Sequence, residues 1–586
     1  MKKLFVILTS AVMLYSCSDF LIVYPENNLS SEEFLYSEKD MEIYVNGFLQ
    51  RYLPDAIGTA YADQYADNVV TRGSTTFLIG NSWRPEDQGG WSGGNTGKWA
   101  QLRDANWFLD NIAKGKSNVS AEVYNHYEGV GRFWRAYFYY DMVRTFGNVP
   151  WYDHELDIAD TAALYKPRDS REFVMDKVLE DLNFASTYCS TDAKVVISST
   201  RITRWVALAF KARVCLFEGT YRKYHTELNL ASSAEKFLRE AMNACEVLMN
   251  ESPYKLVTGG DVKTQYRSLF NSDNLSQTEV ILGVAYKTDL RMHNLTWYTL
   301  SASAGSSWSL TKQFVDQYLM LDGSRFTDKT GYQTMSFGDE FKDRDNRLQQ
   351  TVISPDYQRK VNGTLKKVAP DVWLSGYQLI KWIIDDDVHV GKSTSANSLP
   401  LLRFAEALLT YAEAKAEMGE MDETVWNKTI RPLRERAGVN GNVPAVYDPY
   451  LAAYYRNQTT DKWILEVRRE RSIEMASEQV RYDDIMRWKL GELLAQDWQG
   501  IYIAEKDKDY DLNGDGAIDL TVSDTGSASS TRVVLGTTYK LSEGNSGYLM
   551  YNYNLGRSWL DKKYLRPIPA SALQMNPALG QNPGWQ

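Results

Sequence analysis

The sequence predicts a mainly α-helical protein in which pairs of helices stack on one another and long loop-rich segments are inserted between them. Apolar residues recur at three- and four-residue spacing over much of the chain. Alanine and leucine return at similar offsets in the segments 205–212 and 405–416, and small residues allow helices to stack closely. We therefore expect a tetratricopeptide-like scaffold of helix hairpins. The expected helices are 31–51, 99–112, 121–146, 170–187, 201–221, 233–249, 310–318, 401–418, 423–437 and 462–476.

Three segments do not follow this helical period. Residues 58–99 contain many Gly, Ser, Asn, Asp and Trp residues, and residues 253–310 and 499–560 are rich in Gly, Ser, Asp, Thr and Tyr. We expect the first to be a long irregular loop and the other two to be loops with short strands. Long ordered loops in compact proteins often carry function.

The beginning of the chain has the layout of an export signal. Two lysines precede an apolar run over residues 4–15, and Cys17 follows shortly after. Because this resembles a bacterial lipoprotein signal, we expect residues 1–16 to be a signal peptide and Cys17 to carry lipid, and two acyl chains suffice for stable anchoring. The alternative is an ordinary signal followed by a buried or disulfide-bonded cysteine.

The remainder of the chain should form a helical region 17–250 and a loop-rich region 251–586, which together complete one globule.

Composition narrows the classes of function. A net charge of -10 argues against nucleic acid as a partner. Cys189, Cys215 and Cys245 form no CxxC pair and lie in apolar surroundings, so we expect structural thiols, and the five histidines form no zinc motif. No catalytic triad or phosphate-binding loop is present, so no catalytic residue is assigned, although a carboxylate pair for glycoside hydrolysis stays open.

Two helical segments, one rich in aromatic residues and one rich in charged residues, are expected to be structural. Aromatic residues face several directions in segment 132–141, which predicts core packing. The charged segment 468–474 could bind an anion, but its arginines could equally reach carboxylates on other helices, such as Glu406 or Glu413. We expect a structural polar network there.

A short acidic segment resembles a calcium-binding loop. Oxygen-bearing side chains alternate, and glycine occupies the position where an EF-hand loop turns. The final bidentate glutamate is missing, because Val522 takes its place, so a plain Asx-rich turn is the alternative. A structural calcium ion could be held by Asp511, Asn513, Asp515 and Asp519.

Several motifs follow one another along nearly the whole chain. They are Cys17–Leu21 with Pro25, Arg132–Phe138, Phe146–Pro150, Arg201–Leu216, Leu402–Ala414, Ile430–Gly438, Arg469–Glu474, Arg481–Trp488, Leu565–Pro569 and Leu579–Trp585. In this order they resemble the SusD/RagB family of outer-membrane nutrient-binding lipoproteins.

The resemblance implies a SusD-like helical fold and no catalytic activity. It implies a lipid-anchored protein, exposed at the surface of the outer membrane, that captures oligosaccharides and delivers them to a SusC-like, TonB-dependent transporter. No cofactor is required. The alternatives are a binder of another nutrient, such as peptides, and an anchored glycoside hydrolase.

The aromatic content suggests where a sugar could bind. Seventeen Trp and 38 Tyr residues exceed what core packing normally uses. Stacking one pyranose face on such a ring contributes about 1 kcal/mol. The alternative is that these rings pack beneath their own loops. The candidate ligand-binding residues are Trp83 and Trp91 with Arg72, Asn81 and Arg84, and a second group of Trp297, Tyr298 and Trp308.

Overall fold

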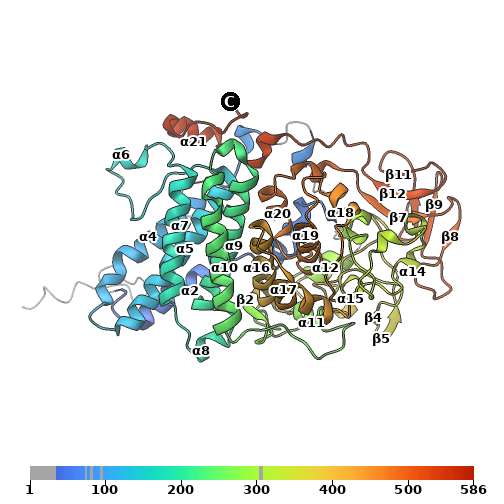
Figure 1. The fold of residues 1–586 in the computed structure, drawn as a ribbon, viewed down its shortest axis with the longest axis horizontal. Coiled ribbons are helices and arrows are strands. Elements are labelled where there is room, and N and C mark those ends of the chain that lie inside the picture. The colour runs from blue at the N-terminus through green and yellow to red at the C-terminus, as the bar shows by residue number, and fades with distance from the viewer. Residues whose placement is uncertain (1–33, 73–75, 80–82, 93–96, 302–307) are drawn as a thin grey trace, which may run out of the picture.

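A computed structural model describes residues 34–586 except 73–75, 80–82, 93–96 and 302–307. Cys17 and Asn81 therefore lie outside the described residues. Long helices fill one side of the molecule, and short strands and loops from the C-terminal half fill the other (Figure 1). Within the described ranges, no helix combines the length and the apolar character needed to cross a membrane.

The N-terminal half is a stack of neighbouring helices (Figure 1). Helix α5 packs against α2, α4 and α7, and α9 packs against α7 and α10. Five of these six helices match the expected ranges within three residues at either end. Their bounds are α2 (Glu38–Tyr52), α4 (Lys98–Asn111), α5 (Ala121–Phe146), α7 (Arg171–Tyr188), α9 (Arg204–Tyr224) and α10 (Ala234–Glu251).

The expected start of the first helix at Ser31 is wrong. Helix α2 begins at Glu38, because the Ser37 side chain accepts from the Asp40 backbone N–H while the Asp40 carboxylate accepts from the Ser37 N–H. This reciprocal pair is a capping box, which satisfies amides that the helix itself leaves unpaired.

The stack continues into the C-terminal half. Helix α16 packs against α10, α17 and α19, and α20 returns to pack against α9. The bounds are α16 (Phe404–Glu417), α17 (Glu423–Arg436), α19 (Lys462–Glu474) and α20 (Arg481–Arg487). The mainly helical scaffold predicted from the sequence is confirmed.

Two of the expected helices are shorter in the structure. Instead of a helix over 310–318, residues 309–310 form a strand and the helix α13 covers only Lys312–Val315. The helix expected from 401 begins at Phe404, because Leu399–Arg403 pairs as a strand with Val280–Val284.

Short strands and helices connect these parts. The antiparallel pairs are β1 with β3, β2 with β6 and β4 with β5, and two three-stranded sheets have the orders β10-β9-β8 and β11-β12-β7. The strands are β1 (Val69–Val70), β2 (Val280–Val284), β3 (Ser309–Leu310), β4 (Gln358–Val361), β5 (Thr364–Lys367), β6 (Leu399–Arg403), β7 (Gln499–Ile503), β8 (Asp509–Tyr510), β9 (Leu520–Ser523), β10 (Arg532–Val534), β11 (Tyr539–Leu541) and β12 (Gly547–Tyr551). The short helices are α3 (Ala56–Tyr61), α6 (Thr161–Leu164), α8 (Ala193–Val196), α11 (Ser268–Asn271), α12 (Leu295–Leu300), α14 (Phe337–Glu340), α15 (Asn346–Thr351), α18 (Pro449–Tyr454) and α21 (Ala570–Met575).

The largest core surrounds α5. Its aromatic residues Phe133, Trp134 and Tyr139 are buried, which confirms the prediction that segment 132–141 packs in the core. Cys189, Cys215 and Cys245 are buried free thiols, as the sequence predicts. Burial raises the pKa of Cys215 to about 12, so this thiol stays protonated at neutral pH.

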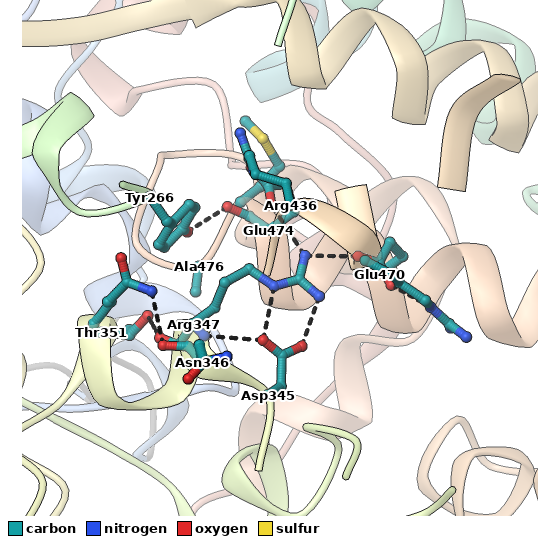
Figure 2. Close-up of polar contacts among 12 residues, drawn as sticks. Tyr266, Asp345, Asn346, Arg347, Thr351, Arg436, Glu470, Glu474 and Ala476 are labelled. Carbon is teal, nitrogen blue, oxygen red and sulfur yellow. Dashed lines mark hydrogen bonds and ion pairs between the residues drawn. The ribbon is translucent and has the colours of Figure 1, made fainter. Parts of the chain in front are cut away.

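A buried network of ion pairs connects α19 to the loop-rich half (Figure 2). Glu474 is fully buried, and its carboxylate accepts hydrogen bonds from three arginines. Arg347 donates to it at 3.0 Å and Arg403 at 2.7 Å, and Arg436 is the third donor. Arg347 also donates to Glu470 at 2.6 Å. Although burial opposes ionisation, these arginines hold the pKa of Glu474 well below its usual range.

The arginines of segment 468–474 belong to the same kind of network. Arg471 donates to Asp484 at 2.9 Å and lies 3.7 Å from Glu413. Glu406 instead accepts from Arg213 on α9, at 2.6 and 2.7 Å. The predicted structural polar network is therefore confirmed, with Glu413 but not Glu406 among its carboxylates.

We predict that Glu474→Gln lowers the free energy of unfolding by about 3–5 kcal/mol, because three buried arginines would lose their shared counter-charge. The measurement is urea denaturation followed by circular dichroism. Glu420→Gln is the control: Glu420 pairs with Lys415 at 2.9 Å near the surface, and its loss should cost less than about 1 kcal/mol. Equal effects of the two substitutions would contradict this role of the network.

Candidate functional site

A cavity of about 520 Å³ lies beside the C-terminal end of α5. We call it the Trp83 cavity. Its volume falls in the range of small-ligand sites, and its walls combine aromatic rings with charged and amide groups. The aromatic residues are Tyr65, Phe77, Trp83, Phe217, Tyr482 and Tyr564, and the polar ones are Gln88, Arg144, Thr145, Gln479, Asp483, Lys563 and Arg566.

Segments far apart in the chain build this cavity. Tyr65 ends the short 3-10 helix Ala62–Tyr65, Arg144 lies in the last turn of α5, and Asp483 lies in the first turn of α20. The C-terminal segment 563–566 closes one side, where the Arg566 backbone N–H donates to the carbonyl of Thr145 at 2.8 Å.

The aromatic surface of the cavity is shared among several rings. Trp83 is half-buried and stacks on Phe77, with ring centroids 5.1 Å apart and an interplanar angle of 19°. The Arg566 guanidinium lies over the Trp83 ring, 5.2 Å from its centroid. Tyr65 is 44% exposed and meets Phe77 edge-on at 5.7 Å. Tyr65 therefore has the most accessible ring of the cavity. Trp83 packs against Phe77, which in turn packs against Tyr65.

Paired charges form the polar side of the cavity. Arg144 donates to both carboxylate oxygens of Asp483 at 2.6 Å and to Asp141 at 2.8 Å. Burial raises the pKa of Asp483, although Arg144 opposes this shift. Burial acts in the same direction on Asp141, but Arg144 and Lys98 outweigh it and hold the pKa of Asp141 below its usual range. Charge-assisted donors and acceptors of this kind make strong hydrogen bonds to hydroxyl groups.

Trp91 lines a different cavity. This second space, of about 430 Å³, lies between α4, residues 150–165 and α21, and its walls are mostly apolar. Trp91 is 8% exposed and packs edge-on against Trp99 and Phe146 at 5.4 and 5.1 Å. The two tryptophans predicted to share one site are therefore separated.

The other predicted ligand residues lie elsewhere. Arg72 is exposed, with its guanidinium 5.0 Å from the ring centroid of Trp373. Trp297 and Tyr298 are half-buried on α12, and Trp308 is 3% exposed within the core of the loop-rich half. Arg84 is exposed and is not among the residues that line the Trp83 cavity. Among the predicted residues that the structure describes, Trp83 alone lines that cavity.

Most residues of the Trp83 cavity were not predicted. Arg144, Tyr482, Asp483 and Arg566 lie in or next to motifs that the sequence marks as scaffold, such as Arg481–Trp488 and Leu565–Pro569. The available signal was that polar and aromatic residues concentrate in those motifs.

The predicted calcium loop folds as a series of Asx-type turns. The Asp511 carboxylate accepts from the N–H groups of Gly514 and Gly516 at 2.6 and 2.8 Å, and Asp519 accepts from that of Leu512 at 2.8 Å. In the part of the chain that the structure describes, no three His, Cys, Asp or Glu residues are grouped as a metal site. Calcium at Asp511, Asn513, Asp515 and Asp519 stays a prediction.

Comparison with known proteins covers almost all of the chain. The family model described as "SusD family" matches residues 264–585, and one described as "Starch-binding associating with outer membrane" matches residues 19–216. SusD-like protein P38 of Formosa agariphila is 25% identical over 82% of this chain and 90% of its own length. A SusD-like protein of Bacteroides ovatus is 23% identical over 99% of this chain and 98% of its own length.

Solved structures share the fold. A SusD-like carbohydrate binding protein from Bacteroides fragilis superposes with a TM-score of 0.68 at 21% identity, covering 93% of this chain and 99% of that one. Surface glycan-binding protein A from Bacteroides fluxus has a TM-score of 0.56 at 16% identity, covering 94% of this chain and 99% of its own. The resemblance noted in the sequence is confirmed.

Two neighbouring aspartates near the cavity differ sharply in their surroundings. Asp63 lies in the same short helix as Tyr65 and is 1% exposed, and among the described residues its carboxylate has a weak contact with the Ser477 backbone N–H and no ion pair. Burial raises the pKa of Asp63 to about 7. Asp67 is equally buried but accepts two hydrogen bonds from Arg481, both at 2.7 Å.

We predict that Asp63→Asn raises the free energy of unfolding at pH 8 by about 2–4 kcal/mol and changes it little at pH 4.5. Between pH 4 and 7 the folded state holds a proton on Asp63 that the unfolded state has released, so wild-type stability falls as pH rises through this range. Urea denaturation at both pH values measures the effect.

Asp67→Asn is the matched control and should destabilise the protein at both pH values, because Arg481 would lose its partner. A loss of stability on Asp63→Asn at pH 8 would show that the Asp63 carboxylate is not an unpaired buried charge.

Proposed function

Because the chain belongs to the SusD family, whose members are non-catalytic binding proteins, we propose that it binds a carbohydrate in the Trp83 cavity at the outer membrane. The observation that carries this proposal is the combination of an accessible aromatic ring, Tyr65, with charged hydrogen-bonding groups in one open cavity. A pyranose offers an apolar face to the ring and a rim of hydroxyls to the charged groups.

The walls of the cavity favour binding over hydrolysis. Glycosidases use two carboxyl groups across the scissile bond, whereas Asp483 is the single carboxylate among the described residues that line this cavity. Nη1 of Arg144 donates to both oxygens of that carboxylate and keeps it charged, so it is placed to accept from hydroxyls.

The cavity also fits a sugar better than an extended peptide. Peptide recognition commonly uses the free edge of a β-sheet. Residues of helices, 3-10 helices and loops line the Trp83 cavity, and no strand of the described structure contributes to it. Two structural relatives carry the names "SusD-like carbohydrate binding protein" and "Surface glycan-binding protein A", which supports the same choice.

We also propose that the protein is a surface lipoprotein that delivers its ligand to a SusC-like, TonB-dependent transporter. The layout of residues 1–17, with Cys17 as the lipidated residue, supports the anchor. The family resemblance supports the transporter as partner.

We predict that Tyr65→Ala weakens binding of a recognised oligosaccharide about five- to tenfold, because about 1 kcal/mol of stacking is lost. Trp83→Ala should weaken it at least as much, since Trp83 supports both Phe77 and Arg566. Affinity electrophoresis against a polysaccharide panel, followed by calorimetry, gives the measurement.

Tyr447→Ala is the matched control, because Tyr447 is similarly exposed, at 42%, and does not line the cavity. Binding unaffected by both Tyr65→Ala and Trp83→Ala would place the ligand elsewhere.

We predict that Cys17→Ser moves the protein from the membrane fraction to the soluble fraction, because without acyl chains little apolar area remains to hold it. Labelling of cells with a radioactive fatty acid, followed by fractionation, checks this. A variant that stays membrane-bound and labelled would refute lipidation at Cys17.

A further inference from the structure

The Trp83 cavity holds more positive than negative charge, although the whole chain carries a net charge of -10. Among the described residues, Arg144, Lys563 and Arg566 line it, against a single carboxylate, Asp483. Arg144 is already paired with Asp483 and with Asp141. The two remaining cations, Lys563 and Arg566, both come from the C-terminal segment.

Arg566 has no counter-charge in the part of the chain that the structure describes. Its guanidinium forms no ion pair and no hydrogen bond with the described residues, and its contact within the protein is with the face of Trp83. Arg344, a core arginine without an ion pair, instead donates to three backbone carbonyls. Because Arg566 is half-buried, its N–H groups remain available on the cavity side. A guanidinium can donate two parallel hydrogen bonds to a carboxylate or a sulfate.

Lys563 is a second cation that pairs with no carboxylate of the described residues. It is 3% exposed, and its ammonium group donates to the carbonyl of Ser558 at 3.3 Å. Burial lowers the pKa of Lys563, and the neighbouring Lys562 adds to this effect. A buried ammonium group with one long hydrogen bond is poorly compensated, so an anion nearby would stabilise it.

We infer that the ligand of the Trp83 cavity is an acidic sugar, a uronic acid or a sulfated residue, whose anionic group is held by Arg566 and Lys563. The inference rests on the proposed function and names the class of glycan. Arg566 lies over Trp83, so the anionic group binds next to the aromatic rings that accept the sugar face.

Two pairs of polymers that differ mainly in charge test the inference. Polygalacturonan is compared with its carboxyl-reduced form, and dextran sulfate with dextran, by affinity electrophoresis and calorimetry on the full chain. We expect the acidic member of at least one pair to bind about tenfold more tightly at low ionic strength, with a smaller advantage in 0.5 M NaCl because salt screens charges.

Substitutions assign that preference to the cavity. Arg566→Gln and Lys563→Gln should each reduce the acidic advantage at least threefold, and Arg566→Lys should restore only part of it, because lysine lacks the planar fork. Arg239→Gln is a charge-matched control on the surface, where Arg239 pairs with Glu235, and it should leave the preference unchanged. Melting curves show whether Lys563→Gln still folds, and Arg566→Gln, at a half-exposed site, provides the test if it does not.

The outcomes separate the two proposals. Equal or tighter binding of the neutral polymers would overturn the acidic-sugar inference and leave carbohydrate binding intact. An acidic preference that survives both Arg566→Gln and Lys563→Gln would also overturn it, since the anion would then bind elsewhere. Absence of binding to these polymers and to a broad neutral panel would refute the proposed function itself.

Discussion

The buried carboxylates that follow one face of α19 and the loop after it are the constraint on which the rest of the structure depends. Glu470, Glu474 and Glu478 accept hydrogen bonds from four arginines on three elements that are distant in sequence, α15, β6 and α17. Burying such charges adds little net stability compared with apolar packing, but each unpaired charge would be costly. Few other arrangements of these chain segments would give every buried carboxylate an arginine partner. The C-terminal half of the molecule consists largely of short strands and loops. The pairing of carboxylates with arginines therefore fixes the relative positions of its segments.

The network also positions the candidate site. Directly after α19, Ser477 and Gln479 have φ of +62° and +69°, a region that costs non-glycine residues about 1–2 kcal/mol each. Between them, Glu478 accepts from Arg403 at 2.6 Å and from Lys381 at 2.5 Å, which holds the turn in place. The chain then enters α20 with Gln479, Tyr482 and Asp483 facing the Trp83 cavity. Strain of this kind persists where surrounding contacts determine the backbone, and it is often found at functional sites.

Helical periodicity predicted the scaffold well because the long helices bury continuous apolar faces. It failed where backbone pairing competed. Leu310 and Leu401–Leu402 have apolar side chains that suit either state, and they lie in strands because β1 and β2 offer partners. The candidate site was harder to predict. Trp83 and Trp91 are eight positions apart, yet the chain turns at Gly90, with φ of +85° beside Phe146, and each ring enters its own cavity. Tyr65, Asp483 and Arg566 meet only through tertiary contacts, which leave no local pattern.

The end of α5 explains why motifs that the sequence marks as structural contribute charged residues to the candidate site. A helix leaves its last carbonyl groups without partners. Here the C-terminal segment supplies them: Arg566 donates its backbone N–H to Thr145, and the Asn582 amide donates to Phe146 at 2.9 Å and to the Arg566 carbonyl at 2.7 Å. Gly147 permits this approach, because it has φ of +76° and a Cβ there would lie 2.9 Å from Leu565. The motifs around Phe146, Leu565 and Asn582 thus form one cap, and capping α5 in this way places the Arg566 side chain over Trp83. The position of the Arg566 side chain in the candidate site therefore follows from the way in which the end of α5 is capped.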